Sequence, residues 1–208
     1  MPGKCLIISG GEFSSHTDIP VDFTADYIIA CDKGFEHAQK LGLRPDLVLG
    51  DFDSYKGKLD STISTIKLPC EKDDTDTMYA VKTALNKGYD DITIICAMGA
   101  RFDHMMGNIQ ACTFAAKEGA FACISGANDV LFFINASSLY LPYKEGWSIS
   151  VFSITDTCTD VSITGAKYNL ECAQLSNTVP IGVSNEWDSD SITVSCGAGI
   201  LMVVQSRL

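Results

Sequence analysis

Residues 4–11 read Lys-Cys-Leu-Ile-Ile-Ser-Gly-Gly, an apolar run that ends in two glycines. An unbroken apolar run of this kind is typical of a strand buried on both faces, as in a parallel sheet. A second such run, residues 27–31, ends in Asp32-Lys33-Gly34, and residues 35–41 then show a helical pattern that stops at Gly42. The alternation of strand and helix predicts an α/β fold with a mainly parallel sheet.

The same alternation continues to about residue 125, and acidic or glycine-rich residues follow the ends of several expected strands. Open α/β sheets bind ligands at the carboxyl ends of their strands, so these loops are expected to form one site. Helical spacing of apolar residues predicts further helices after Asp76 and around Ile109. The further expected strands are residues 47–49, 63–68, 92–97 and 121–124.

The pattern changes beyond about residue 128, where short β-type runs are separated by Gly, Asn, Asp and Ser without a helical stripe. Such a pattern is typical of a β-sandwich or a small barrel. We therefore expect a Rossmann-like α/β domain over residues 1–127 and a smaller all-β sandwich domain over residues 128–208. Its expected strands are residues 130–134, 138–141, 148–154, 161–163, 192–195 and 200–204.

The net charge of −11 argues against nucleic acid as a partner, because phosphate backbones are bound by positive surfaces. An acidic protein can still bind a polyphosphate where local donors and metal ions outweigh its overall field. No stretch approaches the ~20 apolar residues that span a bilayer. The first apolar run is too short for a signal sequence, so a cytoplasmic location is expected. The nine cysteines include no C-x-x-C pair and are expected to be reduced and buried.

Two acidic motifs follow expected strands, Gly50-Asp51-Phe52-Asp53-Ser54 and Asp73-Asp74-Thr75-Asp76. In an extended segment Asp51 and Asp53 point the same way, and hard oxygen ligands at this spacing suit Mg²⁺. Turn formation and helix capping are the competing explanation, since Asp, Ser and Thr also favour those positions. Three acids within residues 73–76 exceed what capping requires, and their mutual repulsion favours a bound cation.

Residues 99–104, Gly-Ala-Arg-Phe-Asp-His, lie between an expected strand and an expected helix. The glycine permits close backbone approach, a helix N-terminus favours an anion, and Arg101 can bind phosphate oxygens in a bidentate manner. The competing interpretation is a surface loop in which Arg101 pairs with Asp103 and His104 has no chemistry. Gly10-Gly11 is a weaker phosphate-binding signal. The sequence contains no G-x-x-x-x-G-K-[ST], no G-x-G-x-x-G and no G-x-S-x-G.

A polar cluster that ends in a large aromatic residue, Ser184-Asn185-Glu186-Trp187, occurs in the second domain. Trp187 lies in a loop-like context and is a candidate platform for a flat heterocycle, with core filling as the alternative. His16 and His37 lie in polar segments that are expected to be exposed, and we assign them no role.

Taken together, these motifs resemble the thiamin pyrophosphokinase family over nearly the whole chain. They are Gly-Gly after the first strand, Asp-x-Gly after the second, Gly-Asp-Phe-Asp-Ser, Lys-Asp-x-Thr-Asp, Gly-x-Arg-x-Asp-His and a late Ser-Asn-Glu-Trp. The resemblance implies an α/β catalytic domain, a β-sandwich, and a homodimer with active sites at the subunit interface. It also implies that ATP donates its β,γ-pyrophosphoryl group to the hydroxyl of thiamin, yielding thiamin diphosphate and AMP.

The resemblance further implies a role for each motif. Asp51, Asp53 and Asp76 would hold Mg²⁺, and Asp73 and Arg101 complete the implied catalytic set. The implied ATP-binding residues are Gly10, Gly11, Asp32, Gly34, Lys72, Thr75, Arg101, Asp103 and His104. The implied thiamin-binding residues are Ser184, Asn185 and Trp187. Asp74 is left to capping and solvent. Lys33 departs from the Asp-Gly-Gly that the family often has, so the backbone is expected to approach less closely there.

Two other functions remain compatible with these residues. A metal-dependent nucleotide phosphohydrolase would use the same acids to activate water. A non-catalytic module would bind thiamin or a nucleotide without turnover, although the complete set of acids argues against it.

Overall fold

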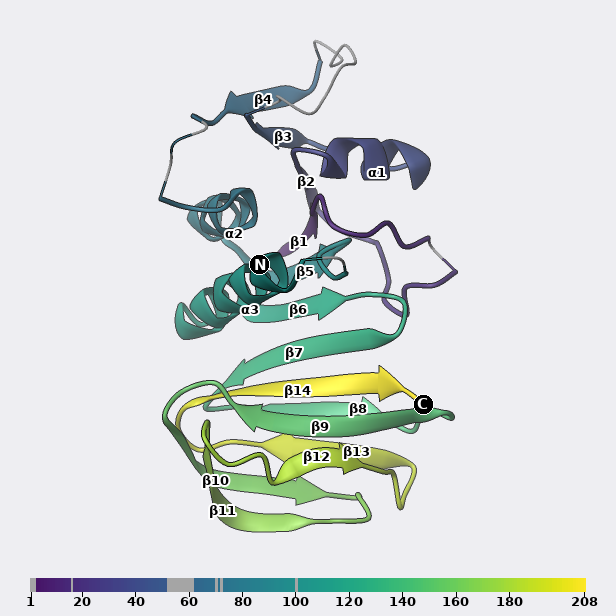
Figure 1. The fold of residues 1–208 in the computed structure, drawn as a ribbon, viewed down its shortest axis with the longest axis vertical. Coiled ribbons are helices and arrows are strands. Elements are labelled where there is room, and N and C mark those ends of the chain that lie inside the picture. The colour runs from purple at the N-terminus through teal and green to yellow at the C-terminus, as the bar shows by residue number, and fades with distance from the viewer. Residues whose placement is uncertain (1–2, 16, 52–61, 70, 72, 100) are drawn as a thin grey trace. The chain divides into compact units, whose positions relative to one another are not determined.

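The computed structural model describes residues 3–15, 17–51, 62–69, 71, 73–99 and 101–208 (Figure 1). Its contacts divide the chain into two compact units, residues 1–127 and residues 128–208. The first unit contains a parallel sheet with helices, and the second contains antiparallel strands, so the predicted fold class is confirmed. In the part of the chain described, no helix has the length and apolar character needed to cross a membrane.

The sheet of the first unit is parallel, with strand order β6-β5-β1-β2-β3-β4. The chain adds β2, β3 and β4 on one side of β1 and then returns to add β5 and β6 on the other side. This reversal is the switch point at which open α/β sheets bind ligands. The elements are β1 (Gly3–Ile8), β2 (Tyr27–Cys31), α1 (Gly34–Lys40), β3 (Leu47–Gly50), β4 (Ser64–Lys67), α2 (Asp76–Asn86), β5 (Tyr89–Ile95), α3 (Phe102–Lys117) and β6 (Phe121–Ser125).

Helices cover both faces of this sheet, with α1 on one side and α2 and α3 on the other (Figure 1). Ala38 of α1 and Leu41 just after it pack with Leu6 and Ile8 of β1, and Ile19 from the following loop joins the same cluster. All five side chains are buried. Coverage on both faces explains why β1 has an unbroken apolar sequence rather than an alternating one.

The second unit is a sandwich of antiparallel strands in the orders β12-β9-β14-β7 and β11-β10-β13-β8. Alternate residues point inward from each sheet, for example Ile149 and Val151 from β9 and Val161 and Ile163 from β10, and they form one core. The elements are β7 (Asp129–Asn135), β8 (Ser138–Pro142), β9 (Trp147–Ser153), β10 (Thr157–Thr164), β11 (Leu170–Ser176), β12 (Gly182–Asn185), β13 (Ser191–Ser195) and β14 (Ile200–Arg207).

The sequence pattern does not predict β11 or β12. Both strands stand at the end of their strand order. Leu175 is the one fully buried residue of β11, and Asn185 is the one fully buried residue of β12. A strand that buries so few side chains shows no apolar alternation, so its sequence is that of a polar loop.

The packing of α1 on β1 is closest at Gly34, where an added Cβ would lie 2.0 Å from the carbonyl oxygen of Ile8. We expect Gly34→Ala to lower the free energy of unfolding by about 1–3 kcal/mol or more, because backbone atoms cannot move aside as a side chain can. Chemical denaturation followed by circular dichroism measures this change.

Gly107→Ala in α3 is the matched control. An added Cβ there would meet Thr75 Cγ2 at 3.8 Å, an ordinary contact, and alanine favours a helix over glycine. This variant is expected to be neutral or stabilising. Equal destabilisation by both substitutions would contradict the packing argument.

Candidate active site

A cleft of about 1080 Å³ opens at the carboxyl edge of the parallel sheet. The loops after β1, β2 and β5 and the N-termini of α2 and α3 border it, as the sequence predicts for the ligand site. Its volume is of the size that small-molecule ligands occupy. Gly34, Asp51 and Asp73 are not among its described lining residues. The sequence-predicted residues that line it are Gly10, Gly11, Asp32, Thr75, Asp76, Arg101, Asp103 and His104.

The loops after β1 and β5 are joined through their backbones. The N–H groups of Gly11 and Glu12 donate to the carbonyl oxygens of Cys96 and Met98 at 2.8 and 3.0 Å. An added Cβ at Gly11 would lie 2.6 Å from the Cys96 oxygen, so this approach requires glycine. Gly99 has a φ of +95° and abuts the Glu12 side chain, so it requires glycine for both reasons. One wall of the cleft is therefore main chain from two strand ends.

The loop after β2 approaches the β3 end and the β1 end. The N–H of Asp32 donates to the Leu49 carbonyl at 2.8 Å, and an added Cβ at Gly50 would lie 3.1 Å from the Asp32 Cα. Asp51, which follows Gly50, is thereby placed beside the end of β2. Lys33 lines the cleft, and its Cβ would lie 3.3 Å from a Cβ added at Gly10. The backbone approach at this point is therefore made possible by Gly10, which leaves space beside the Lys33 side chain.

The start of α2 decides how its acidic residues are used. Thr75 is the N-cap, and its hydroxyl oxygen accepts a hydrogen bond from the Met78 N–H at 3.1 Å. Asp74 pairs with Lys82 at 2.7 Å. Asp76, in the first turn, lines the cleft. Since the threonine caps the helix, capping does not account for Asp76.

The start of α3 brings Arg101 and Asp103 together as an exposed pair. Arg101 Nε donates to Asp103 Oδ1 at 3.1 Å, and this hydrogen bond lowers the pKa of Asp103. An exposed ion pair contributes little to stability, so a phosphate can compete for the guanidinium at small cost. His104 and Asn108 follow on the same helix and also line the cleft.

The predicted metal site is described only in part, because Asp53 and Lys72 lie outside the described residues. Among the residues that are described, no group of three or more His, Cys, Asp or Glu side chains lies close enough to hold a metal ion. The described acids that line the cleft are Glu12, Asp32, Asp76 and Asp103. Asp51 follows the end of β3, next to the end of β2 that carries Asp32. Carboxylate oxygens are the donors that Mg²⁺ prefers, so the chemistry of the set fits that ion.

Two residues near the cleft were not assigned a role from the sequence. The expectation that His37 is exposed is wrong, because its side chain is buried and its Nε2 lies 3.0 Å from the Gly11 carbonyl oxygen. Asn108 is also buried, and its Nδ2 donates to the Ala97 carbonyl at 2.7 Å. Asn108 could have been found from its spacing, since it lies four residues after His104 on the same helical face.

Of the residues expected to bind thiamin, one is exposed, and the other two make hydrogen bonds within the second unit. Ser184 is exposed and has a φ of +57°, a conformation that is uncommon for residues other than glycine. Asn185 is buried, and its amide bonds both backbone polar groups of Tyr168 at 2.7 and 3.0 Å. Trp187 packs partly against the sandwich core, and its indole N–H donates to the Leu141 carbonyl at 3.3 Å. Its ring meets Tyr143 edge-on, with the ring centroids 6.3 Å apart.

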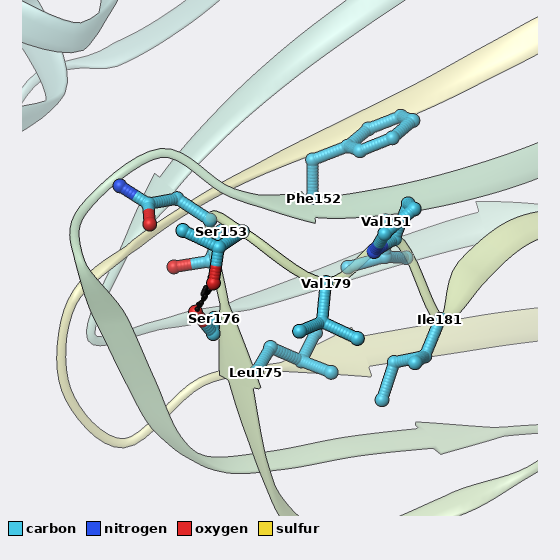
Figure 2. Close-up of a pocket in the computed structure, with 10 residues that line it drawn as sticks. Val151, Phe152, Ser153, Leu175, Ser176, Val179 and Ile181 are labelled. Atoms are coloured by element: carbon cyan, nitrogen blue, oxygen red, sulfur yellow. Dashed lines mark hydrogen bonds between the residues drawn. The ribbon is translucent and has the colours of Figure 1, made fainter.

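A smaller hollow of about 280 Å³ lies in the second unit (Figure 2). It is bordered by β9, the end of β11 and the segment that follows, where Val179 and Ile181 stand near Leu175 and Val151 (Figure 2). None of the described residues that line it carries a charge. It therefore offers no counter-charge for a polyphosphate, which distinguishes it from the cleft of the first unit.

The fold and the site are those of an open α/β domain with a polar cleft at its switch point, a class in which nucleotides and other phosphorylated ligands bind. Two family models identify the particular family. Residues 23–124 match the model described as thiamin pyrophosphokinase, catalytic domain, and residues 138–201 match thiamin pyrophosphokinase, vitamin B1 binding domain. The chain belongs to the thiamin pyrophosphokinase family.

Individual relatives agree over the full length of the chain. The thiamine pyrophosphokinase of Bacillus subtilis (strain 168) is 27% identical, over 96% of this chain and 97% of that protein. A crystal structure of thiamine pyrophosphokinase from Bacillus subtilis superposes with a TM-score of 0.87 and 25% identity, covering 99% of both chains. A thiamin pyrophosphokinase family protein from Enterococcus faecalis gives 0.80 and 26%, again with 99% of both chains covered.

Proposed function

We propose that the cleft binds ATP with Mg²⁺ and that the chain transfers the β,γ-pyrophosphoryl group of ATP to the hydroxyl of thiamin. The products are thiamin diphosphate and AMP. The observation that carries this proposal is the presence of Asp32, Asp76 and Arg101 in one cleft of a chain that belongs to this family. Carboxylates suit a metal ion on the triphosphate, and an arginine suits its oxygens.

In this reaction the thiamin hydroxyl oxygen bonds to the β-phosphorus of ATP. The bond between that phosphorus and the oxygen it shares with the α-phosphorus breaks, and AMP leaves with that oxygen. Such a step depends on in-line positioning and on neutralising the triphosphate charge. Arg101 would bind phosphate oxygens, while the backbone of Gly10 and Gly11 would lie against the nucleotide. The hydroxyl proton passes to an acceptor, for which a carboxylate of the cleft is the candidate.

Magnesium, when bound, neutralises charge on the triphosphate. We assign Asp51, Asp53 and Asp76 as its ligands, with Asp73 as a supporting acid. The oxygen-donor chemistry of the described members supports this assignment. Thr75 acts on the same site through the N-cap that fixes the first turn of α2.

We assign thiamin to the surface around Ser184 and Trp187 in the second unit. Backbone strain tends to be stored at functional sites, and the positive φ of Ser184 supports a role there. The ring of Trp187 would offer an apolar face to a heterocycle. Asn185 would contribute by fixing the backbone of Tyr168, since its amide is bonded within the chain.

We further propose a cytoplasmic homodimer in which the second unit of one subunit and the first unit of its partner complete each active site. Exposed apolar side chains support association, because soluble monomers seldom expose them in groups. Val179, Ile181 and Val183 are each about half exposed or more in and before β12. Phe102 and Met106 are exposed one turn apart on α3, next to the cleft residue Arg101.

The assay that tests this function measures AMP release from ATP with Mg²⁺, with and without thiamin. We expect AMP to form only when thiamin is present, because the hydroxyl of thiamin is the acceptor. Formation of AMP or ADP at the same rate without thiamin would instead indicate the nucleotide phosphohydrolase. No AMP under either condition, with ATP or thiamin still bound, would indicate a non-catalytic module.

Asp76→Asn tests the assignment of metal ligands. The loss of one carboxylate from the set should lower kcat by at least ~10²-fold and raise the Mg²⁺ concentration that gives half-maximal rate. Asp74→Asn is the control, because Asp74 is paired with Lys82 and does not line the cleft. It should leave both quantities within about twofold. Similar losses in the two variants would show that general acidity near α2, rather than ligation, matters.

Trp187→Leu tests the thiamin site. We expect the KM for thiamin to rise by ~3- to 10-fold, as the loss of a favourable aromatic contact implies, while the KM for ATP stays unchanged. Trp147→Leu is the control, because Trp147 is also half-buried in the sandwich but its ring is covered by Lys144. A lower Tm with an unchanged KM for thiamin would show that Trp187 only fills the core.

A further inference from the structure

His37 does not line the cleft, but it is hydrogen-bonded to Gly11, which does. It lies on α1, its side chain is 2% exposed, and its Nε2 lies 3.0 Å from the Gly11 carbonyl oxygen. A carbonyl oxygen can only accept a hydrogen bond, so Nε2 carries the proton and donates it. The neutral ring is therefore the tautomer with its proton on Nε2.

The other ring nitrogen of His37 shows that filling space does not by itself explain a histidine at this position. Nδ1 is buried and has no hydrogen-bond partner among the residues that the structure describes. A buried acceptor without a partner is unfavourable, whereas an apolar side chain of similar size would fill the space without that cost. What the imidazole adds to this position is the N–H group that bonds Gly11.

Gly11 is hydrogen-bonded to two other elements that surround the cleft. Its own N–H donates to the Cys96 carbonyl at 2.8 Å, which ties it to the end of β5. Its carbonyl accepts from His37, which ties it to α1. Gly10 and Gly11 themselves line the cleft. The loop is therefore held by two backbone hydrogen bonds to the residues after β5, from Gly11 and Glu12, and by one from the His37 ring.

We propose that His37 is a positioning residue for nucleotide binding, and that its Nε2–H holds the Gly10–Gly11 loop in the conformation that borders the cleft. This proposal rests on the proposed function, because it takes the nucleotide to be ATP. His37 contacts no ligand and acts only through the Gly11 carbonyl.

The surroundings of His37 keep the ring neutral near pH 7. Burial lowers the pKa of His37 most, and the positive charges of Lys33 and Lys40 lower it further. The hydrogen bond to Gly11 and the negative charge of Glu36 raise the pKa, but the net shift is downward. The loop after β1 presents an uncharged group to the ring, Phe13, at 5.4 Å between ring centroids. The Nε2 donor does not depend on this shift, because the protonated ring also carries a proton on Nε2.

The test compares three variants with the wild-type protein. His37→Leu removes the donor and keeps an apolar side chain. His37→Gln keeps an N–H donor on a side chain of similar reach. Ala38→Gly loosens the same helix at a buried position that packs with Leu6 and Ile8 of β1. His37→Met replaces the leucine variant if that variant does not fold, since methionine adapts to irregular spaces.

For His37→Leu we expect the KM for ATP to rise ~3- to 10-fold, the range that one hydrogen bond of ordinary net strength implies. The kcat and the KM for thiamin should change by less than twofold. Amide hydrogen exchange over residues 9–15 should be faster in the absence of nucleotide. His37→Gln should restore most of both effects, and Ala38→Gly should lower the Tm with the KM for ATP unchanged.

Two results would overturn the proposal. One is unchanged exchange over residues 9–15 in His37→Leu. The other is a rise in the KM for ATP that Ala38→Gly reproduces at the same loss of Tm, because that would make the effect purely structural. Absence of AMP formation by the wild-type protein would instead contradict the proposed function. The exchange measurement needs no nucleotide, so it still decides whether His37 holds the loop.

Discussion

The cleft depends on backbone atoms from different strand ends lying closer together than side chains would allow. Gly34 lies against the Ile8 carbonyl, and Gly11 lies against the Cys96 carbonyl. Each contact brings another loop toward the end of β1, where the strand order of the sheet reverses. Without these approaches the carboxylates after β2 and in the first turn of α2 would not border the same space as the loop after β5. The glycines therefore determine where the charged residues can act.

Local charge then decides how an acidic protein can hold a polyanion. With a net charge of −11, the molecule as a whole repels ATP. Arg101, Lys33 and His104 are basic or ionisable groups that line the cleft, and the starts of two helices border it. The acids at the same edge add negative charge, so a bound divalent ion would be needed to make their combination with a triphosphate favourable. This requirement links the proposed metal to the proposed substrate on electrostatic grounds.

Much of this arrangement can be predicted from the sequence because parallel strands buried on both faces leave unbroken apolar runs. The ends of those runs located the loops that carry Asp32, Asp76 and Arg101. His37 could not be found in this way, because its hydrogen bond reaches a glycine 26 residues earlier in the chain and leaves no local sequence pattern. For a similar reason β12 was missed, since a strand with one buried residue, Asn185, leaves no periodic signal. Tertiary contacts decided both cases.

Some motif residues stabilise the local backbone, and the sequence around them does not reveal this. Thr75 belongs to the acidic motif but caps α2, and Asn185 belongs to the late polar motif but bonds the backbone of Tyr168. Neither needs to touch a ligand to be required, because each holds backbone next to a residue that we propose meets the ligand. Asp76 and Ser184 are those neighbours, one in the first turn after the cap and the other beside the buried amide. The spacing within each motif is thus consistent with a pair of residues, one that holds the backbone and one that is proposed to meet the ligand.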